Sequence, residues 1–523
     1  SSARADPKMP NAPSSALRQP APPARRRRRT RAIAAFVAAA LAAQPLLGLW
    51  PSNAAAQVQR LPDLGDESQT TLAPAQERKL GESIVRQIRA QGGYMDDPEV
   101  NDYLNDIGHK LVAAIHDGPQ EFEFFAVPDP TINAFALPGG FIGVHTGLIL
   151  LAQSESELAA VLAHEISHVT QHHLARMMAS QKGSSLIQLA ALAVALAAAR
   201  TGGNSGGQLA SAAIASSQAL ALQQQLNFTR DNEYEADRIG FQRLDASGYD
   251  VSGMATFMER LQRSTRFTDN AAPSYLRTHP ITYERIAEAQ ARAAGKAYRQ
   301  VPDSLDFHLV RALLRSYNGT AKEAVANFEF AIADKKYNSE VAARYGLIAS
   351  LLRDQDYKRA TAELTALEKI APPHPMIDSM AAHVYMDSGD LDRALKRFEK
   401  ALALYPNKMQ FIYDYPDALL SAKRPRDAIA FTERELARFP SDGRLHRTAA
   451  KAYATIGNRM QQHRHLAEVA VWQGDLRGAV TQLELALKAG DGDFYQVAVV
   501  ETRLRTLRQE LLEQQRDRAT RNG

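Results

Sequence analysis

The most regular pattern of apolar and polar positions begins at Ser154. Apolar residues then recur every three or four positions, at Leu158, Val161, Leu162, Ile166 and Val169. This period predicts an α-helix with one buried face. Ser154 followed three positions later by Glu157 is typical of a capping box at a helix start, and neither Gly nor Pro occurs between Ser154 and Met178. We therefore expect a regular, partly buried helix from residue 155 onward.

Upstream of this helix the pattern changes to a period of two. Residues 121–127 alternate as in a β-strand. Residues 133–137 and 141–144 predict two short strands, joined by a tight turn at residues 138–140 (Pro-Gly-Gly). The open edge of this hairpin could take up an extended peptide as an added strand, or the hairpin could be purely structural. Residues 77–115 have a helical pattern interrupted by Gly.

Two Ala-rich segments follow the first helix. Residues 184–199 and 208–226 flank a Gly-rich stretch at 202–207. The pattern predicts a helical hairpin that is too short for a transmembrane pair. Three roles stay open for residues 184–226: a mobile lid, a peripheral contact with a membrane surface, or packing against the core.

The C-terminal part of the chain contains a repeat. Ala360, Ala394 and Ala428 are spaced by 34 residues, as are Pro372, Pro406 and Pro440. This period is that of tetratricopeptide repeats, whose helix pairs stack and leave a concave groove for a partner's peptide. We expect about four clear units from residue 305 and one or two degenerate ones after residue 442. A purely structural spacer is the alternative.

The first 56 residues are expected to be a leader rather than part of the fold. A basic block at residues 25–29 precedes an apolar run at residues 32–49 and three small residues at 54–56. This order is typical of a bacterial secretory signal, cleaved near Ala56, and predicts a periplasmic protein. An uncleaved membrane anchor is the alternative.

Composition narrows the classes of function. Residues 1–56 hold nine basic residues and one acidic residue, so the net charge of +4 for the chain becomes −4 for residues 57–523. We therefore expect no binding of nucleic acid. The chain has no Cys, so any metal site must be built from His, Asp or Glu, which favours a catalytic over a structural zinc site.

The predicted helix carries the run His164-Glu165-Ile166-Ser167-His168. On an α-helix the two histidines face the same side one turn apart, where they can supply two ligands to Zn²⁺. Glu165 between them can accept a proton from a water molecule at the metal. Taken alone, the same residues would also fit a helix with two surface histidines.

A catalytic zinc ion needs a third protein ligand and one open position. Glu233 and Asp237 are four residues apart on a second predicted helix, so both face one side. Glu233 can bind the metal, and Asp237 can accept an N–H from a ligand histidine and fix its tautomer, whereas Glu235 points elsewhere. The alternative is a solvated acidic face that pairs with Arg230 or Arg238.

Three further histidines are close to the motif or follow a strand. His172 continues the spacing of four beyond His168, but a single ion cannot reach a third turn of one helix. We interpret His172 and the adjacent His173 as surface or second-sphere residues. His145 follows a predicted strand and is expected to be structural.

Together, the runs HEISH, NEYEADRIG and NAFALPGG resemble the M48 family of gluzincin metallopeptidases, and the resemblance covers essentially all residues after the leader. The leader and the repeats narrow this resemblance to one periplasmic branch of the family, which assists β-barrel assembly. We expect a mainly α fold with a small β hairpin or sheet. The expected parts are a leader at 1–56, a metallopeptidase domain at 57–300, an α-solenoid of tetratricopeptide repeats at 301–499 and a charged helical tail at 500–523.

The resemblance implies one Zn²⁺ per chain, with His164, His168 and Glu233 as ligands, Glu165 as general base and Asp237 in the second sphere. It also implies a role for His279, which lies in the run HPITYER. His279 would stabilise the oxyanion, or bind the metal itself in a resting state. From the residues alone, His279 is a loop histidine before Pro280.

The implied function is that of a periplasmic zinc metalloendopeptidase. Its implied substrates are unfolded or misassembled outer-membrane β-barrel proteins, and its implied partner is the β-barrel assembly machinery. A chaperone or assembly scaffold with low proteolytic turnover is the rival from another class of function. An inner-membrane M48 protease is a second rival if the leader stays uncleaved.

Overall fold

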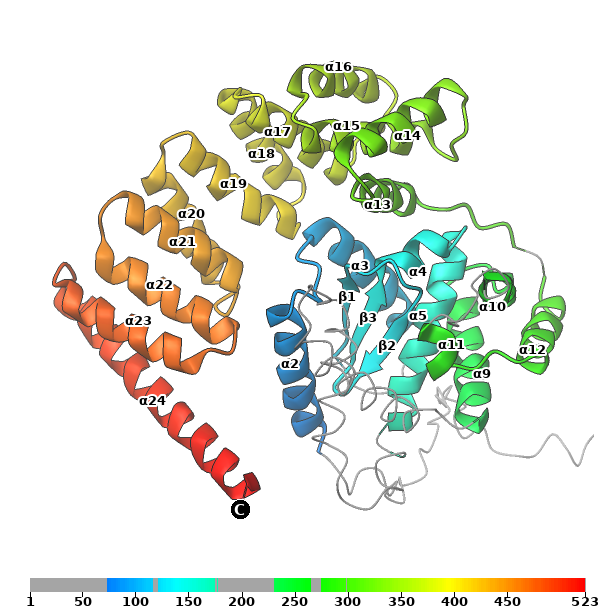
Figure 1. The fold of residues 1–523 in the computed structure, drawn as a ribbon, viewed down its shortest axis with the longest axis horizontal. Coiled ribbons are helices and arrows are strands. Elements are labelled where there is room, and N and C mark those ends of the chain that lie inside the picture. The colour runs from blue at the N-terminus through cyan, green and yellow to red at the C-terminus, as the bar shows by residue number, and fades with distance from the viewer. Residues whose placement is uncertain are drawn as a thin grey trace, which may run out of the picture. The chain divides into compact units, whose positions relative to one another are not determined.

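The computed structural model describes residues 73–115, 121–174, 176, 230–264, 274–297 and 299–522. They form a small β-sheet with its helices and a long array of helices (Figure 1). The predicted leader and the Ala-rich segments at 184–226 lie outside the described residues. Within the described part of the chain, no helix has both the length and the apolar character needed to cross a membrane.

The sheet contains the three predicted strands, β1 (Glu123–Val127), β2 (Ala134–Leu137) and β3 (Phe141–His145). Their order is β1-β3-β2, with β3 parallel to β1 and antiparallel to β2. The turn between β2 and β3 depends on Gly139 and Gly140, whose φ angles of 76° and 84° are unfavourable for other residues. The predicted hairpin is confirmed, and β2 lies at an edge of the sheet. The parallel pairing was not predicted, because alternation does not identify a strand's partner.

The helix that carries HEISH is α5 (Glu155–Thr170). The Ser154 hydroxyl caps it by accepting the N–H of Glu157. The predicted capping box is only half correct, because the Glu157 carboxylate accepts the N–H of Gln153 instead of that of Ser154. Every residue from Glu155 to His168 is buried. The helix is therefore more deeply buried than its one-sided pattern predicted, because α3, α9, α10 and β2 all pack against it.

A glycine allows α9 (Arg230–Ala246) to approach α5 closely. A Cβ atom at Gly240 would lie 3.2 Å from the backbone nitrogen of His164, a distance that leaves almost no room for a larger residue. This close contact at Gly240 brings the acidic side chains of α9 within reach of the histidines of α5. The helix α10 (Ser252–Ser264) packs against α5 as well.

Two helices occupy the stretch that was expected to be helical with interruptions, α2 (Pro74–Ala90) and α3 (Pro98–Ala114). The Asp97 carboxylate starts α3 by accepting the backbone N–H groups of Glu99 and Val100. The remaining helices described before the array are α4 (Thr146–Leu151), α11 (Ser274–Thr278) and α12 (Tyr283–Ala294).

The predicted repeats form an array of consecutive helices (Figure 1). Their bounds are α13 (Leu305–Ser316), α14 (Ala321–Ala333), α15 (Glu340–Arg353), α16 (Tyr357–Glu368), α17 (Pro375–Asp387), α18 (Leu391–Leu404), α19 (Met409–Ser421), α20 (Pro425–Leu436), α21 (Gly443–Thr455), α22 (Arg459–Trp472) and α23 (Leu476–Ala489). Ala360, Ala394 and Ala428 are fully buried, which explains why a small residue recurs there. The mainly α fold with a helical solenoid is confirmed. A last helix, α24 (Phe494–Asn522), packs on α23.

Helix α3 contacts the array through polar side chains. The Tyr345 hydroxyl on α15 donates to Glu99 Oε2 at 3.0 Å, and Lys408 Nζ lies 3.1 Å from Asp106 Oδ2. Burial, together with the nearby charge of Asp97, raises the pKa of Glu99 to about 8. Loss of the Glu99 proton in the folded protein is therefore unfavourable.

The Glu99→Gln variant tests this pKa. Because the folded-state pKa is above the ordinary value of 4.5, the stabilisation by protonated Glu99 is complete below that value and is lost as the pH rises toward 8. Gln cannot ionise, so the variant should raise the thermal unfolding midpoint over wild type more at about pH 8.5 than at about pH 5. The exposed Glu501→Gln is the control. An equal shift at both pH values would show that the pKa assignment is wrong.

Candidate metal centre

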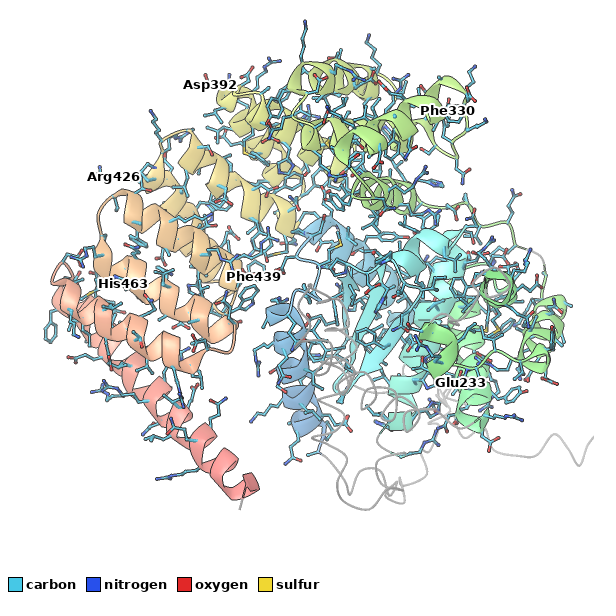
Figure 2. The ribbon with its side chains drawn as sticks, viewed as in Figure 1. Glu233, Phe330, Asp392, Arg426, Phe439 and His463 are labelled. Atoms are coloured by element: carbon cyan, nitrogen blue, oxygen red, sulfur yellow. The ribbon has the colours of Figure 1, made fainter. Side chains whose placement is uncertain are left out.

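Helices α5 and α9 bring the predicted metal ligands together. His164 Nε2 lies 2.9 Å from His168 Nε2, and the Glu233 carboxylate lies 3.5 Å and 3.4 Å from these two nitrogens, respectively. His279, which follows α11, places Nδ1 3.0 Å from Glu233 Oε1. All four residues are buried, and one ligand atom of each lies within 4.8 Å of the others. Figure 2 labels Glu233 within this part of the molecule.

Asp237 contacts the side of His164 that faces away from this cluster. Its Oδ1 lies 2.9 Å from His164 Nδ1. Burial alone would lower the pKa of His164, but the hydrogen bonds to Asp237 and Glu233 raise it to about 10. Burial likewise opposes ionisation of Asp237, yet His164 and Arg285 hold the pKa of Asp237 below its usual range. The two side chains form a buried ion pair.

Arg285 on α12 is a site residue that sequence reasoning missed. Its Nε and Nη2 donate to the Asp237 carboxylate at 2.6 Å and 2.8 Å, and Nη1 lies 2.7 Å from Glu233 Oε2. Nη1 also donates to the Pro280 carbonyl, one residue after His279. The expected alternative of a solvated acidic face on α9 is wrong, because Glu233 and Asp237 are buried. The available signal was the position of Arg285, six residues after His279 in the same run.

A second polar chain contacts His168. His173 is fully buried, and its Nδ1 lies 2.8 Å from His168 Nδ1. On its other side, His173 Nε2 lies 3.1 Å from Glu235 Oε2, to which Arg176 Nη2 donates at 2.8 Å. His173 is therefore buried rather than on the surface, and it contacts one of the candidate ligands. Glu235 points away from the cluster, as expected, but toward His173.

Glu165 faces the cluster from α5. It is 1 % exposed, and its Oε1 lies 3.6 Å from His279 Nε2. Within the described residues this oxygen has no hydrogen-bond partner. A buried carboxylate oxygen without a donor is unfavourable unless another group or a water molecule satisfies it. A carboxylate in this position can accept a proton from a water molecule beside it.

The donor set fits a divalent metal ion. His164 Nδ1 faces Asp237 and His168 Nδ1 faces His173, so the two Nε2 atoms face each other at 2.9 Å. Two proton-free nitrogens this close would repel, so a proton or a metal cation between them is favourable. The raised pKa of His164 likewise shows that the cluster favours positive charge, and a metal ion would displace that proton. Two imidazoles with one carboxylate are common ligands of catalytic zinc.

Two other predicted features lie outside the cluster. His145 is buried, and its Nδ1 lies 2.9 Å from the Thr131 hydroxyl, in agreement with a structural role. The edge strand β2 packs against α5, and the Tyr275 N–H donates to the Ile132 carbonyl just before that strand. The segment that leads to His279 is thereby attached beside the edge of the sheet.

Comparison with known proteins agrees with this site. The pattern of peptidase family M48 matches residues 98–293, and that of the tetratricopeptide repeat matches residues 385–452. The chain is 34% identical to the putative beta-barrel assembly-enhancing protease of Vibrio cholerae, over 80% of this chain and 86% of that protein. It is 31% identical to the beta-barrel assembly-enhancing protease of Escherichia coli, over 86% and 91%. It is 29% identical to the mitochondrial metalloendopeptidase OMA1 of Schizosaccharomyces pombe, over 41% and 60%.

The Glu233→Ala variant tests whether these residues bind a metal. Removal of one of three donors should lower the bound divalent metal from about one ion per chain to nearly none, measured by mass spectrometry of the purified protein. Asp231→Ala, an exposed position on the same helix, should keep its metal. A folded Glu233→Ala protein with full metal content would remove Glu233 from the site.

Proposed function

Because the chain belongs to peptidase family M48 and is a metalloprotease, we propose that it is a zinc endopeptidase of the periplasm. Its proposed substrates are misassembled outer-membrane β-barrel proteins. The observation that carries the proposal is the buried convergence of His164, His168 and Glu233. Nitrogen and carboxylate donors without any Cys favour Zn²⁺ among the metals of hydrolases.

The residues around the site can each take a part in peptide hydrolysis. When bound, Zn²⁺ supplies a Lewis acid that activates water and polarises the scissile carbonyl. Glu165 takes the proton of the attacking water and passes it to the leaving amine. Asp237 fixes the tautomer of His164, and Arg285 balances the charges of Asp237 and Glu233. A scaffold without turnover would have no use for a buried carboxylate at Glu165.

The Glu165→Gln variant tests the proposed base. Gln occupies the same volume but cannot accept the proton, so the protein should fold and keep its zinc. Hydrolysis of an unstructured peptide should fall about 10²–10⁴-fold in kcat. Glu121→Gln on the surface is the control for the substitution itself. Turnover at the wild-type rate in Glu165→Gln would contradict the assignment.

His279 is proposed to block the site in the resting protein. Its Nδ1 and Nε2 lie near Glu233 and Glu165, so the ring occupies the space between the proposed third ligand and the proposed base. The ring also stacks obliquely on Tyr275, with centroids 4.7 Å apart. A substrate carbonyl therefore requires His279 to move. The segment 274–279 would act as a latch that opens for clients.

The His279→Ala variant separates a latch from an oxyanion donor. Removal of a latch should raise the hydrolysis of an unstructured peptide severalfold, because the site becomes open. Removal of an oxyanion donor would instead lower kcat by about 10²–10³-fold. Arg277→Ala, exposed on α11, should leave the rate unchanged. A decrease confined to His279→Ala would contradict the latch.

Substrate recognition is proposed to use two surfaces. The edge strand β2 beside α5 can pair with an extended chain, and an unassembled β-barrel protein offers unpaired strands of this kind. The tetratricopeptide array would bind clients or the β-barrel assembly machinery. The names of the relatives from Vibrio cholerae and Escherichia coli support this class of substrate. The basic and apolar leader sequence supports export to the periplasm.

A further inference from the structure

The backbone changes direction just after α5, so that His173 packs back against this helix. Helix α5 ends at Thr170, and His172 has a φ of 52°, in the left-handed region. On a continuous helix, a residue five positions after His168 would point about 140° away from it. The reversal at His172 instead places the His173 ring against His168, with ring centroids 4.8 Å apart.

The hydrogen-bond partners of His173 determine where its proton lies. Ionised Glu235 can only accept, so the proton of a neutral His173 lies on Nε2, which faces Glu235 Oε2 at 3.1 Å. His173 Nδ1 is then an acceptor. Because it lies 2.8 Å from His168 Nδ1, the His168 nitrogen must donate. A neutral His168 with its proton on Nδ1 carries its lone pair on Nε2, the atom that faces His164 and Glu233.

We propose that His173 is a positioning residue, and that the chain His168–His173–Glu235 holds His168 in its metal-binding tautomer and orientation. This inference rests on the ligand role of His168 in the proposed function. Asp237 contacts His164 directly, whereas Glu235 reaches His168 only through a second imidazole. Arg176 in turn holds Glu235. Each ligand histidine of α5 is thus oriented by an acidic residue of α9.

The chain His168–His173–Glu235, here called the relay, predicts which side chains can replace His173. In Asn, the amide oxygen is attached to Cγ, as Nδ1 is in His, so His173→Asn keeps an acceptor for His168. In Gln, the amide group lies one carbon further out, where Nε2 lies in His. Gln therefore places no acceptor beside His168. Phe fills the space of the ring but accepts nothing.

The test is the zinc affinity of the full-length chain, measured by competition with a chromophoric chelator. His173→Phe and His173→Gln should bind zinc about 10–100-fold more weakly than wild type. His173→Asn should recover most of this loss. His172→Asn is the matched control, because Asn tolerates the left-handed conformation of that neighbouring position, and it should bind zinc as wild type does. Glu235→Ala should weaken binding in the same direction as His173→Phe.

The possible outcomes separate the relay from the proposed function. Wild-type zinc affinity in His173→Phe would overturn the relay and leave the proposed function intact. Equal losses in His173→Asn and His173→Phe would also overturn it, because they would indicate packing alone. If the wild-type chain itself bound no zinc, both the proposed function and the relay would be wrong. Weak zinc binding by His173→Phe and His173→Gln, with recovery in His173→Asn, would establish the relay.

Discussion

The buried carboxylates of α9 are the constraint on which the rest of the structure depends. Glu233 and Asp237 lie inside the protein, where an ionised carboxylate is stable only beside positive charge or hydrogen-bond donors. Arg285 contacts both, and His164 contacts Asp237. These contacts exist only when α5, α9 and α12 are packed together. The metal donors therefore form as a consequence of folding, and the same charges that stabilise the fold align the histidines.

Local geometry explains which parts of the site were predictable. The spacing of four in His164 and His168, and again in Glu233 and Asp237, places each pair on one side of a helix whatever the fold. Arg285 and His173 could not be found in this way. Arg285 on α12 reaches Glu233 and Asp237 on α9, and His173 reaches His168 only because His172 adopts a φ of 52°. Sequence periodicity carries no information about such a reversal.

The fold, like the site, has parts that could be predicted from the sequence and parts that could not. Alternation predicted β1, the Pro-Gly-Gly turn predicted the hairpin of β2 and β3, and the period of 34 predicted the array, because each pattern lies within one element, one turn or one repeat. The parallel pairing of β1 with β3 and the contact of α3 with the array depend on segments far apart in the chain. Glu99 shows the consequence: a residue that is ordinary in sequence acquires a pKa of about 8, chiefly because the fold buries it beside Tyr345, more than two hundred residues away in the chain.

Zinc-edge X-ray absorption of the zinc-loaded, full-length chain tests the central claim most directly, since it reports the atoms bound to the metal. The account predicts a first shell of nitrogen and oxygen only, at about 2.0–2.2 Å, with the outer-shell scattering of at least two imidazoles. A shell of oxygen alone, without the imidazole signal, would contradict the convergence of His164 and His168 on one ion.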